Sequence, residues 1–318
     1  MAAYRPDPAL FERQLASIRT QSVDDFRVII CADGGQAEVR ALVARLTDAD
    51  RRFSVIGADD RLGFYRNFER ALSAVPSHAA WVALSDQDDF WHERKLELML
   101  PHLDRASMVA AQARVVRYPD GAILSPNTRR RNVAVADLPV FNQFTGGMSV
   151  FRRGILDLAL PFPVSDSPAR VHDQWLALCA AVTDEALVIP DLVQDYVQHG
   201  GNVLGETADA RLRPLASWHR LRDRVREEHG SASPRGLAAA AFAASAGWAE
   251  TMVETLAERL PANQSARQLG SLYGRRRSLF RVAAHLGRSV ISGNVPLRNA
   301  IVYLAGSALR PLARRRVR

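Results

Sequence analysis

Three carboxylates stand within four residues of the chain, in the segment SDQDD at residues 85–89. The segment follows the apolar run Trp81–Leu84, which we expect to be a buried strand. Carboxylates this close repel one another unless a cation compensates them. Oxygen ligands on a loop suit Mg²⁺ or Mn²⁺, which complete their coordination shells with water and substrate phosphates. The segment therefore predicts a divalent metal site, with an ordinary acidic surface turn as the alternative.

The elements that would position this segment alternate between strand and helix. Their interval predicts an α/β fold with a mostly parallel sheet flanked by helices. Ligands bind such sheets beyond the carboxyl ends of the strands, where Asp33 and residues 85–89 both fall. We expect helices at residues 8–18, 36–46, 64–75, 92–103 and 171–181, strands at 26–31, 53–56, 81–84, 108–116, 148–151 and 187–189, and a long loop at 118–140.

The chain changes character near Thr207, where it becomes rich in alanine and arginine and carries helix signals without strand signals. We therefore divide it into residues 1–205 and a basic, helical C-terminal extension at residues 206–318. The net charge of the chain is +8, yet residues 206–318 hold 20 arginines against 8 acidic residues. The two parts therefore carry opposite net charges and are expected to meet different partners.

The last 60 residues, 259–318, contain 13 arginines and no acidic residue, together with short apolar stretches. This pattern favours peripheral contact with an anionic membrane surface. A solvated helix face, packing against the catalytic domain or dimerisation are the alternatives. Interleaved aromatics and a recognisable binding module are missing, so we expect no nucleic-acid partner.

The two cysteines, Cys31 and Cys179, belong to no metal-ligand or disulfide pattern. No apolar stretch reaches the ~18–20 residues of a spanning helix, and the N-terminus lacks the apolar core of a signal peptide. These features predict a cytoplasmic protein, peripheral at most on the inner face of the plasma membrane.

The motifs together resemble the inverting glycosyltransferases of family 2, which have the GT-A fold, and in particular their rhamnosyltransferase-type branch. The resemblance covers roughly residues 1–205. In that family an apolar strand precedes the Ala3-Tyr4 position, so we expect the first strand to be truncated here and translation to start upstream. The matching pieces are Ala3-Tyr4, QLASI at 14–18 with Gln21, CADGG at 31–35, Leu62-Gly63 with NFE at 67–69, SDQDDFW at 85–91, FTGG at 144–147, HDQW at 172–175 and QHGGNV at 198–203.

The resemblance implies that Asp88 binds Mg²⁺ or Mn²⁺ directly and that Asp86 is a second carboxylate near the ribose or the metal. It also implies that His199 reaches the metal or the diphosphate. Asp86 as a turn cap, Asp89 as a helix cap and His199 as a structural turn residue are the alternatives.

On the donor side, the resemblance implies that Asp33 binds the nucleobase, a uracil or thymine, and that Tyr4 lies near the nucleotide. The usual acidic partner of Asp33 is replaced by Ala32, which leaves the base preference open. The remaining residues assigned to the donor or acceptor pocket by resemblance, each with a packing role or an ordinary turn as the alternative, are Gly63, Asn67, Gly146 and Gly147.

Asp173 begins an apolar helix and, by resemblance, is the general base that deprotonates the acceptor hydroxyl, with helix capping as the other role. The implied activity is metal-dependent, inverting transfer of a sugar, rhamnose being one candidate, from a dTDP- or UDP-linked donor. The acceptor would be a saccharide or a lipid-linked molecule in surface-polysaccharide synthesis. A catalytically silent sugar- or nucleotide-binding scaffold at the membrane is the alternative from another class.

Overall fold

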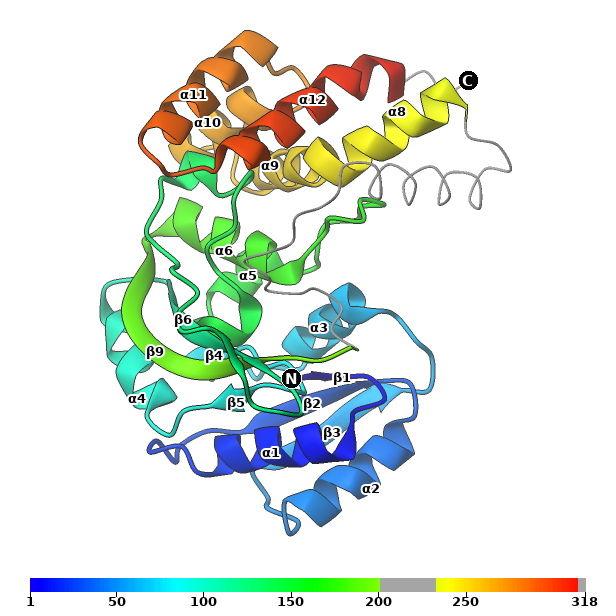
Figure 1. The fold of residues 1–318 in the computed structure, drawn as a ribbon, viewed down its shortest axis with the longest axis vertical. Coiled ribbons are helices and arrows are strands. Elements are labelled where there is room, and N and C mark those ends of the chain that lie inside the picture. The colour runs from blue at the N-terminus through cyan, green and yellow to red at the C-terminus, as the bar shows by residue number, and fades with distance from the viewer. Residues whose placement is uncertain (201–232, 314–318) are drawn as a thin grey trace. The chain divides into compact units, whose positions relative to one another are not determined.

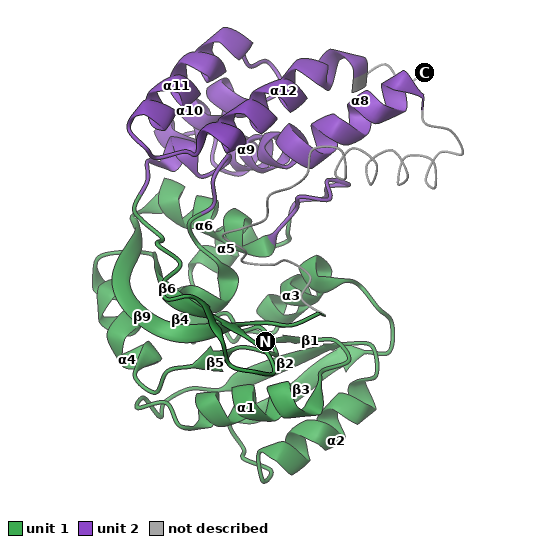
Figure 2. Cartoon of the chain, viewed as in Figure 1, with its two compact units in different colours: residues 1–132, 143–162, 172–206 green, residues 133–142, 163–171, 207–318 purple. Residues whose placement is uncertain are grey.

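The computed structural model describes residues 1–200 and 233–313 (Figure 1). Residues 201–203 of the motif at 198–203 and the predicted boundary at residue 205 lie outside the described residues. The chain forms two compact units, which Figure 2 colours separately. Unit 1 contains residues 1–132, 143–162 and 172–206, and unit 2 contains residues 133–142, 163–171 and 207–318.

The first sheet of unit 1 is parallel, with the strand order β1 (Ala2–Ala3), β2 (Val28–Asp33) and β3 (Phe53–Ala58). β1 pairs only two residues with β2, and the Met1 ammonium donates to the carbonyl oxygen of Ile29 at 2.9 Å. β2 matches β3 residue for residue along its whole length. Asp33 therefore lies at the carboxyl end of a fully paired central strand.

Three helices accompany this sheet: α1 (Pro8–Arg19), α2 (Gln36–Leu46) and α3 (Phe64–Ser73). The Asp7 carboxylate caps α1 by accepting from the amides of Ala9 and Leu10, and Pro8 occupies the first turn, where its missing N–H costs nothing. The apolar side of α1 is buried through Phe11 and Leu15. This burial fixes the helix against the sheet.

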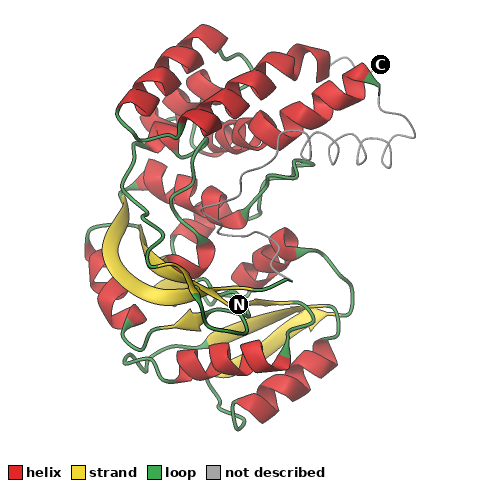
Figure 3. Cartoon of the chain, viewed as in Figure 1, coloured by secondary structure: helices red, strands yellow, loops and turns green. Residues whose placement is uncertain are grey.

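The second sheet is mixed and has the order β4-β8-β6-β9-β5, with β7 paired to the far part of β6. Only β6 and β9 run parallel; their neighbours are antiparallel. Figure 3 shows β9 as a long, strongly curved strand. The strands are β4 (Trp81–Ala83), β5 (Phe90–Trp91), β6 (Met108–Arg117), β7 (Ile123–Ser125), β8 (Ser149–Arg152) and β9 (Ala186–Gln198).

Short and long helices complete unit 1: α4 (Lys95–Met99), α5 (Ile155–Ala159) and α6 (His172–Thr183). The predicted helix at residues 92–103 is shorter than expected. Residues 90–91 form β5, and Leu100–Asp104 is a 3-10 helix because Pro101 has no amide hydrogen to continue an α-helical ladder. The α/β fold class is confirmed, with its strands divided between a parallel and a mixed sheet.

Unit 2 is helical in its described part, with α8 (Pro234–Phe242), α9 (Trp248–Arg259), α10 (Gln264–Tyr273), α11 (Leu279–Ile291) and α12 (Leu297–Ala313). The segment 133–142 belongs to it through buried Asp137, which accepts from His285 and Ser289 at 3.0 and 2.6 Å. The described helices include none that is long and apolar enough to cross a membrane.

One carboxylate joins three segments of unit 2. Glu250 on α9 accepts from Arg277, and from both Nε and Nη2 of Arg310 on α12. Burial acts to raise the pKa of Glu250, but the bonds from Arg310 and Arg277 outweigh it and hold the pKa below its usual 4.5. The ionised carboxylate therefore stabilises the fold above pH 4.5, and this contribution is lost as the pH falls through the lower folded-state pKa.

We expect Glu250→Gln to lower the free energy of unfolding of unit 2 by about 2 kcal/mol at neutral pH, because it weakens charge-assisted bonds to two little-exposed arginines. Chemical denaturation measures the change, and the difference from wild type should shrink in acid. Glu254→Gln is the matched control, because the Arg275 guanidinium is 3.8 Å from Glu254 and largely exposed, and glutamine keeps an oxygen to accept from the Arg275 amide. Equal losses in the two variants would contradict this account.

Candidate active site

The acidic segment after β4 folds against two consecutive glycines, Gly146 and Gly147, that lead into β8. A β-carbon built on Gly147 would lie 3.0 Å from Oδ2 of Asp89 and 3.5 Å from Oδ2 of Asp86. Carboxylates of the acidic segment therefore surround the α-carbon of Gly147. Only a residue without a side chain fits there without displacing them.

Asp89 is tied to β9. Its Oδ1 accepts from the amide of Val197 at 3.1 Å, and its Oδ2 accepts from Nε2 of Gln194 at the same distance. The side chain is 1% exposed. Asp89 therefore anchors the acidic segment to the mixed sheet, and the alternative that it caps a helix at His92 is wrong because its carboxylate is engaged by β9 and α4 begins later.

Asp88 and His199 meet across the site. Nε2 of His199 lies 2.8 Å from Oδ2 of Asp88, and both side chains are less than one-fifth exposed. The two residues are 111 positions apart in the chain. The structure thus brings together two residues that the sequence assigned to one metal.

Asp86 lies in the most charged part of the cluster. Burial, followed by the nearby carboxylates of Asp88 and Asp173, raises the pKa of Asp86 to about 7. Burial, followed by the neighbouring carboxylates of Asp86 and Asp88, also raises the pKa of Asp89 well above its usual value. The ionised carboxylates of such a cluster repel one another, and a bound cation relieves this repulsion. The cluster therefore attracts cations.

Asp173 stands on the other side of the glycine pair, at the start of α6. Its Oδ2 accepts from the amide of Gly146 at 3.1 Å, and its Oδ1 accepts from the amide of Gln174. The preceding His172 stacks on Phe68 with ring centroids 3.7 Å apart. Burial lowers the pKa of His172 to about 3, so the imidazole stays neutral near pH 7 and adds no charge beside Asp173.

Asp33, at the end of β2, is 3% exposed and fixes the loop before α3. Its two oxygens accept from the amides of Leu62 and Gly63 at 2.6 and 2.9 Å. Gly63 has φ +80°, which a residue with a side chain rarely adopts. The carboxylate thus holds a turn, and its oxygens have lone pairs that can accept a further hydrogen bond.

Tyr4 lies beside the acidic segment because Gln87 bonds both its amide and its carbonyl oxygen, at 2.7 and 3.2 Å. The guanidinium of Arg61 lies 4.2 Å from the centre of the Tyr4 ring. Asn67, in contrast to Tyr4, makes its hydrogen bonds away from the acidic segment. It is 1% exposed and bonds the carbonyl oxygen of Cys31 and the side chain of Arg70, so it packs inside the parallel sheet and its helix.

A known protein family matches the N-terminal part of the chain. The family model "Glycosyl transferase family 2" matches residues 1–158. The chain carries a family 2 glycosyltransferase domain. It is 25% identical over 241 residues to the uncharacterized glycosyltransferase YwdF of Bacillus subtilis (strain 168), an alignment that covers 72% of this chain and 82% of YwdF.

Solved structures share the fold of this glycosyltransferase. The structure of S. aureus TarS 1-349 in complex with UDP-GlcNAc has a TM-score of 0.51 and 13% sequence identity, and covers 98% of this chain and 90% of its own. The complex of TarS 1-349 with UDP has a TM-score of 0.50 at 13% identity, covering 98% and 86%. At this identity the similarity establishes the fold alone.

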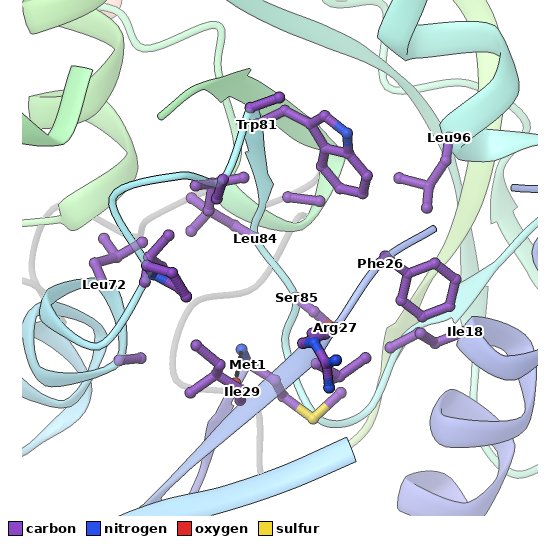
Figure 4. Close-up of a pocket in the computed structure, with 18 of the residues that line it drawn as sticks. Met1, Ile18, Phe26, Arg27, Ile29, Leu72, Trp81, Leu84, Ser85 and Leu96 are labelled. Carbon is purple, nitrogen blue, oxygen red and sulfur yellow. Dashed lines mark hydrogen bonds between the residues drawn. The ribbon is translucent and has the colours of Figure 1, made fainter. Parts of the chain in front are cut away.

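An apolar cavity of about 370 Å³ lies in unit 1 of the glycosyltransferase (Figure 4). Its lining comes from β2, α3, β4 and the loops that precede β2 and β4, and includes Ile29, Leu72 and Trp81. It touches the acidic segment only through Ser85, and none of the four aspartates at positions 33, 86, 88 and 173 lines it. The cavity is therefore separate from the carboxylates of the candidate site, although Asp25, Arg27 and His78 also line it.

Lys95, the single lysine of the chain, was not among the site residues predicted from the sequence. Its side chain is fully buried, and its Nζ donates to the carbonyl oxygen of Gly147 and to Oε1 of Gln194, the latter at 2.6 Å. It also lies 3.8 Å from the ring centre of Trp91. Burial lowers the pKa of Lys95 well below its usual value, against the opposing effect of the Asp89 and Asp86 carboxylates. The signal for Lys95 in the sequence was its position four residues after Trp91.

We expect Gly146→Ala to lower the transfer rate roughly 10–100-fold, because the new β-carbon would lie 2.9 Å from Nε2 of His172. That ring is held by its stack on Phe68, so the start of α6 must move and carry Asp173 with it. Steady-state kinetics measures the loss. Gly154→Ala is the matched control because its β-carbon would meet nothing within 4 Å. A Gly146→Ala enzyme as active as Gly154→Ala would show that the contact is tolerated.

Proposed function

We propose that this glycosyltransferase performs metal-dependent, inverting transfer of a sugar from a nucleoside-diphosphate donor to a hydroxyl of a saccharide or lipid-linked acceptor. The observation that carries the proposal is the position of the glycine pair. Gly146 bonds Asp173 on one side, and Gly147 lies against Asp86 and Asp89 on the other. A base and a metal-type acidic cluster therefore border one backbone segment.

The residues present suit a divalent metal. Asp88 and Asp86 offer hard carboxylate oxygens, and His199 adds a ring nitrogen at 2.8 Å from Asp88. The described residues contain no ready-made cluster of three or more ligand side chains. Proteins often hold Mg²⁺ or Mn²⁺ through one or two carboxylates plus the phosphates of the substrate. Such an ion supplies Lewis-acid neutralisation of the charge that develops on the departing diphosphate.

Asp173 would act as the general base. The acceptor oxygen attacks the anomeric carbon, the bond from that carbon to the diphosphate oxygen breaks, and the acceptor proton moves to a carboxylate oxygen of Asp173. A single displacement of this kind inverts the anomeric configuration. The bond from the Gly146 amide fixes the carboxylate, and His172 beside it is neutral near pH 7 and adds no charge of its own.

Asp33 and Tyr4 would bind the nucleoside. The Asp33 oxygens each accept one backbone amide and can accept a further N–H, such as that of a uracil or thymine ring. Tyr4, with Arg61 over its ring, offers a flat surface beside the acidic segment. A UDP- or dTDP-linked sugar is therefore the donor class, with dTDP-rhamnose the first candidate by motif resemblance and UDP-GlcNAc, the ligand of TarS, the second. The biological setting proposed is surface-polysaccharide assembly at the cytoplasmic side of the membrane.

A donor panel tests the proposal. The full chain is incubated with Mn²⁺, dTDP- and UDP-linked sugars and simple saccharide acceptors, and release of the nucleoside diphosphate is measured with and without acceptor. The expected result is acceptor-stimulated release for one donor, and a product whose anomeric configuration, by NMR, is opposite to that of the donor. Retention of configuration, or turnover unaffected by metal chelation, would contradict it.

A further inference from the structure

Helices α11 and α12 of unit 2 expose an unusual amount of apolar surface. Seven of the eleven large apolar side chains that are exposed among the described residues lie between positions 279 and 312. Phe280 is 82% exposed and Ile291 is 89% exposed. The two helices pack against each other and are joined by a short turn (Figure 1). Exposed apolar side chains gathered on two neighbouring helices are typical of an interaction site.

The exposed residues follow the helical period. On α12 the outward positions Leu297, Ile301, Ala305, Ala308 and Leu312 are spaced by four, four, three and four residues, which places them on one side of the helix. Its inward side is buried through other residues, Ala300 and Tyr303 among them. α12 is therefore apolar toward the protein and apolar toward solvent, so packing within unit 2 does not account for the outer side.

The same part of the chain is strongly basic. From Arg259 to the end there is no acidic residue. A hollow of about 590 Å³ between α10 and α11 is lined by Arg267, Arg281 and Arg288, and by the exposed Phe280. None of the described residues that line the hollow is a carboxylate, so an anionic group placed there meets positive or neutral side chains among them.

These observations select one partner. A second copy of the chain would bring two arginine-rich surfaces of like charge together, which is unfavourable. An anionic phospholipid surface offers both an apolar layer and negative charge. We propose that α11 and α12 bind such a surface, with the apolar side of α12 and Phe280 in the acyl boundary and a lipid phosphate in the arginine-lined hollow. The inference concerns unit 2 and does not depend on the transfer chemistry.

Flotation of the full chain with vesicles tests the proposal. Vesicles of phosphatidylcholine alone are compared with vesicles that also contain phosphatidylglycerol, for wild type, Ile301→Ser and Arg281→Gln. Ile123→Ser is the matched control, because Ile123 in unit 1 is 57% exposed and Ile301 is 56% exposed. All three substitutions lie at exposed positions, and circular dichroism confirms that each variant is folded.

Wild type and Ile123→Ser are expected to float with phosphatidylglycerol vesicles and not with phosphatidylcholine alone. Ile301→Ser should lower the partition coefficient roughly tenfold through lost apolar burial, and Arg281→Gln about fivefold through lost charge. Equal binding to both vesicle types, or Ile301→Ser floating like Ile123→Ser, would overturn the proposal. So would a concentration-dependent dimer of the wild type that Ile301→Ser abolishes, since it would identify a second copy as the occupant.

Discussion

Replacing Asp173 by asparagine is expected to lower kcat by about 10²–10⁴-fold while the affinity for the donor stays near that of wild type. The amide keeps one oxygen that can accept from Gly146, while the bond from the Gln174 amide at the start of α6 is lost. The asparagine amide cannot accept the acceptor proton, so only the chemical step suffers. Transfer kinetics at saturating donor measures the rate, and donor-dependent thermal protection measures binding.

Asp157→Asn on α5 is the matched control for this substitution, because the Asp157 side chain is 67% exposed and outside the acidic cluster. It should leave both readouts unchanged. A second check is donor hydrolysis in the absence of acceptor. If Asp173→Asn transferred sugar at the wild-type rate, or lost donor binding together with the rate, Asp173 would not be the base.

Lys95→Met is expected to lower the free energy of unfolding of unit 1 by about 3–5 kcal/mol and to abolish metal-dependent donor binding. The substitution keeps an apolar chain of similar length but removes the Nζ that bonds Gly147 and Gln194. Gln194 in turn bonds Asp89. The acidic segment therefore loses a nearby positive charge, and the Gln194 side chain that holds Asp89 loses the donor that fixes it. A buried carboxylate left without compensation is strongly destabilising.

The control for Lys95→Met is Leu96→Met, at the next and equally buried position of α4. A volume-conserving apolar exchange there should cost less than about 1.5 kcal/mol and leave donor binding intact. Denaturant titration and donor protection are measured on both proteins. If Lys95→Met unfolded like Leu96→Met and still bound the donor, the buried amine would have no role in holding the acidic segment.

Local signals in the sequence were sufficient for much of the fold. The Asp7 cap with Pro8 gave the start of α1, and the helix predicted at residues 36–46 coincides with α2. Elements that depend on distant partners were harder. β9 spans Ala186–Gln198, yet Pro190 and Asp191 interrupt its apolar pattern, so only a short strand was predicted. Its pairing with β6 overrides that interruption.

The loop predicted at residues 118–140 contains β7, which pairs with β6 through a tight turn around Gly121. Turn residues were visible there, but the short, exposed strand lacks a buried alternation. The same limit applies to the candidate site. The acidic segment and the glycine pair stand out locally, whereas Lys95 and Gln194 act through contacts across 99 residues that a single sequence does not reveal.

The most direct test of the account is Mn²⁺-dependent thermal protection by a panel of nucleotide sugars, compared between wild type and Asp88→Ala. The account predicts that one UDP- or dTDP-linked sugar with Mn²⁺ raises the wild-type Tm by about 5 °C at saturating concentration, and that EDTA or Asp88→Ala removes this rise. Protection that persists equally in EDTA and in Asp88→Ala would contradict a donor bound through a metal at the acidic segment.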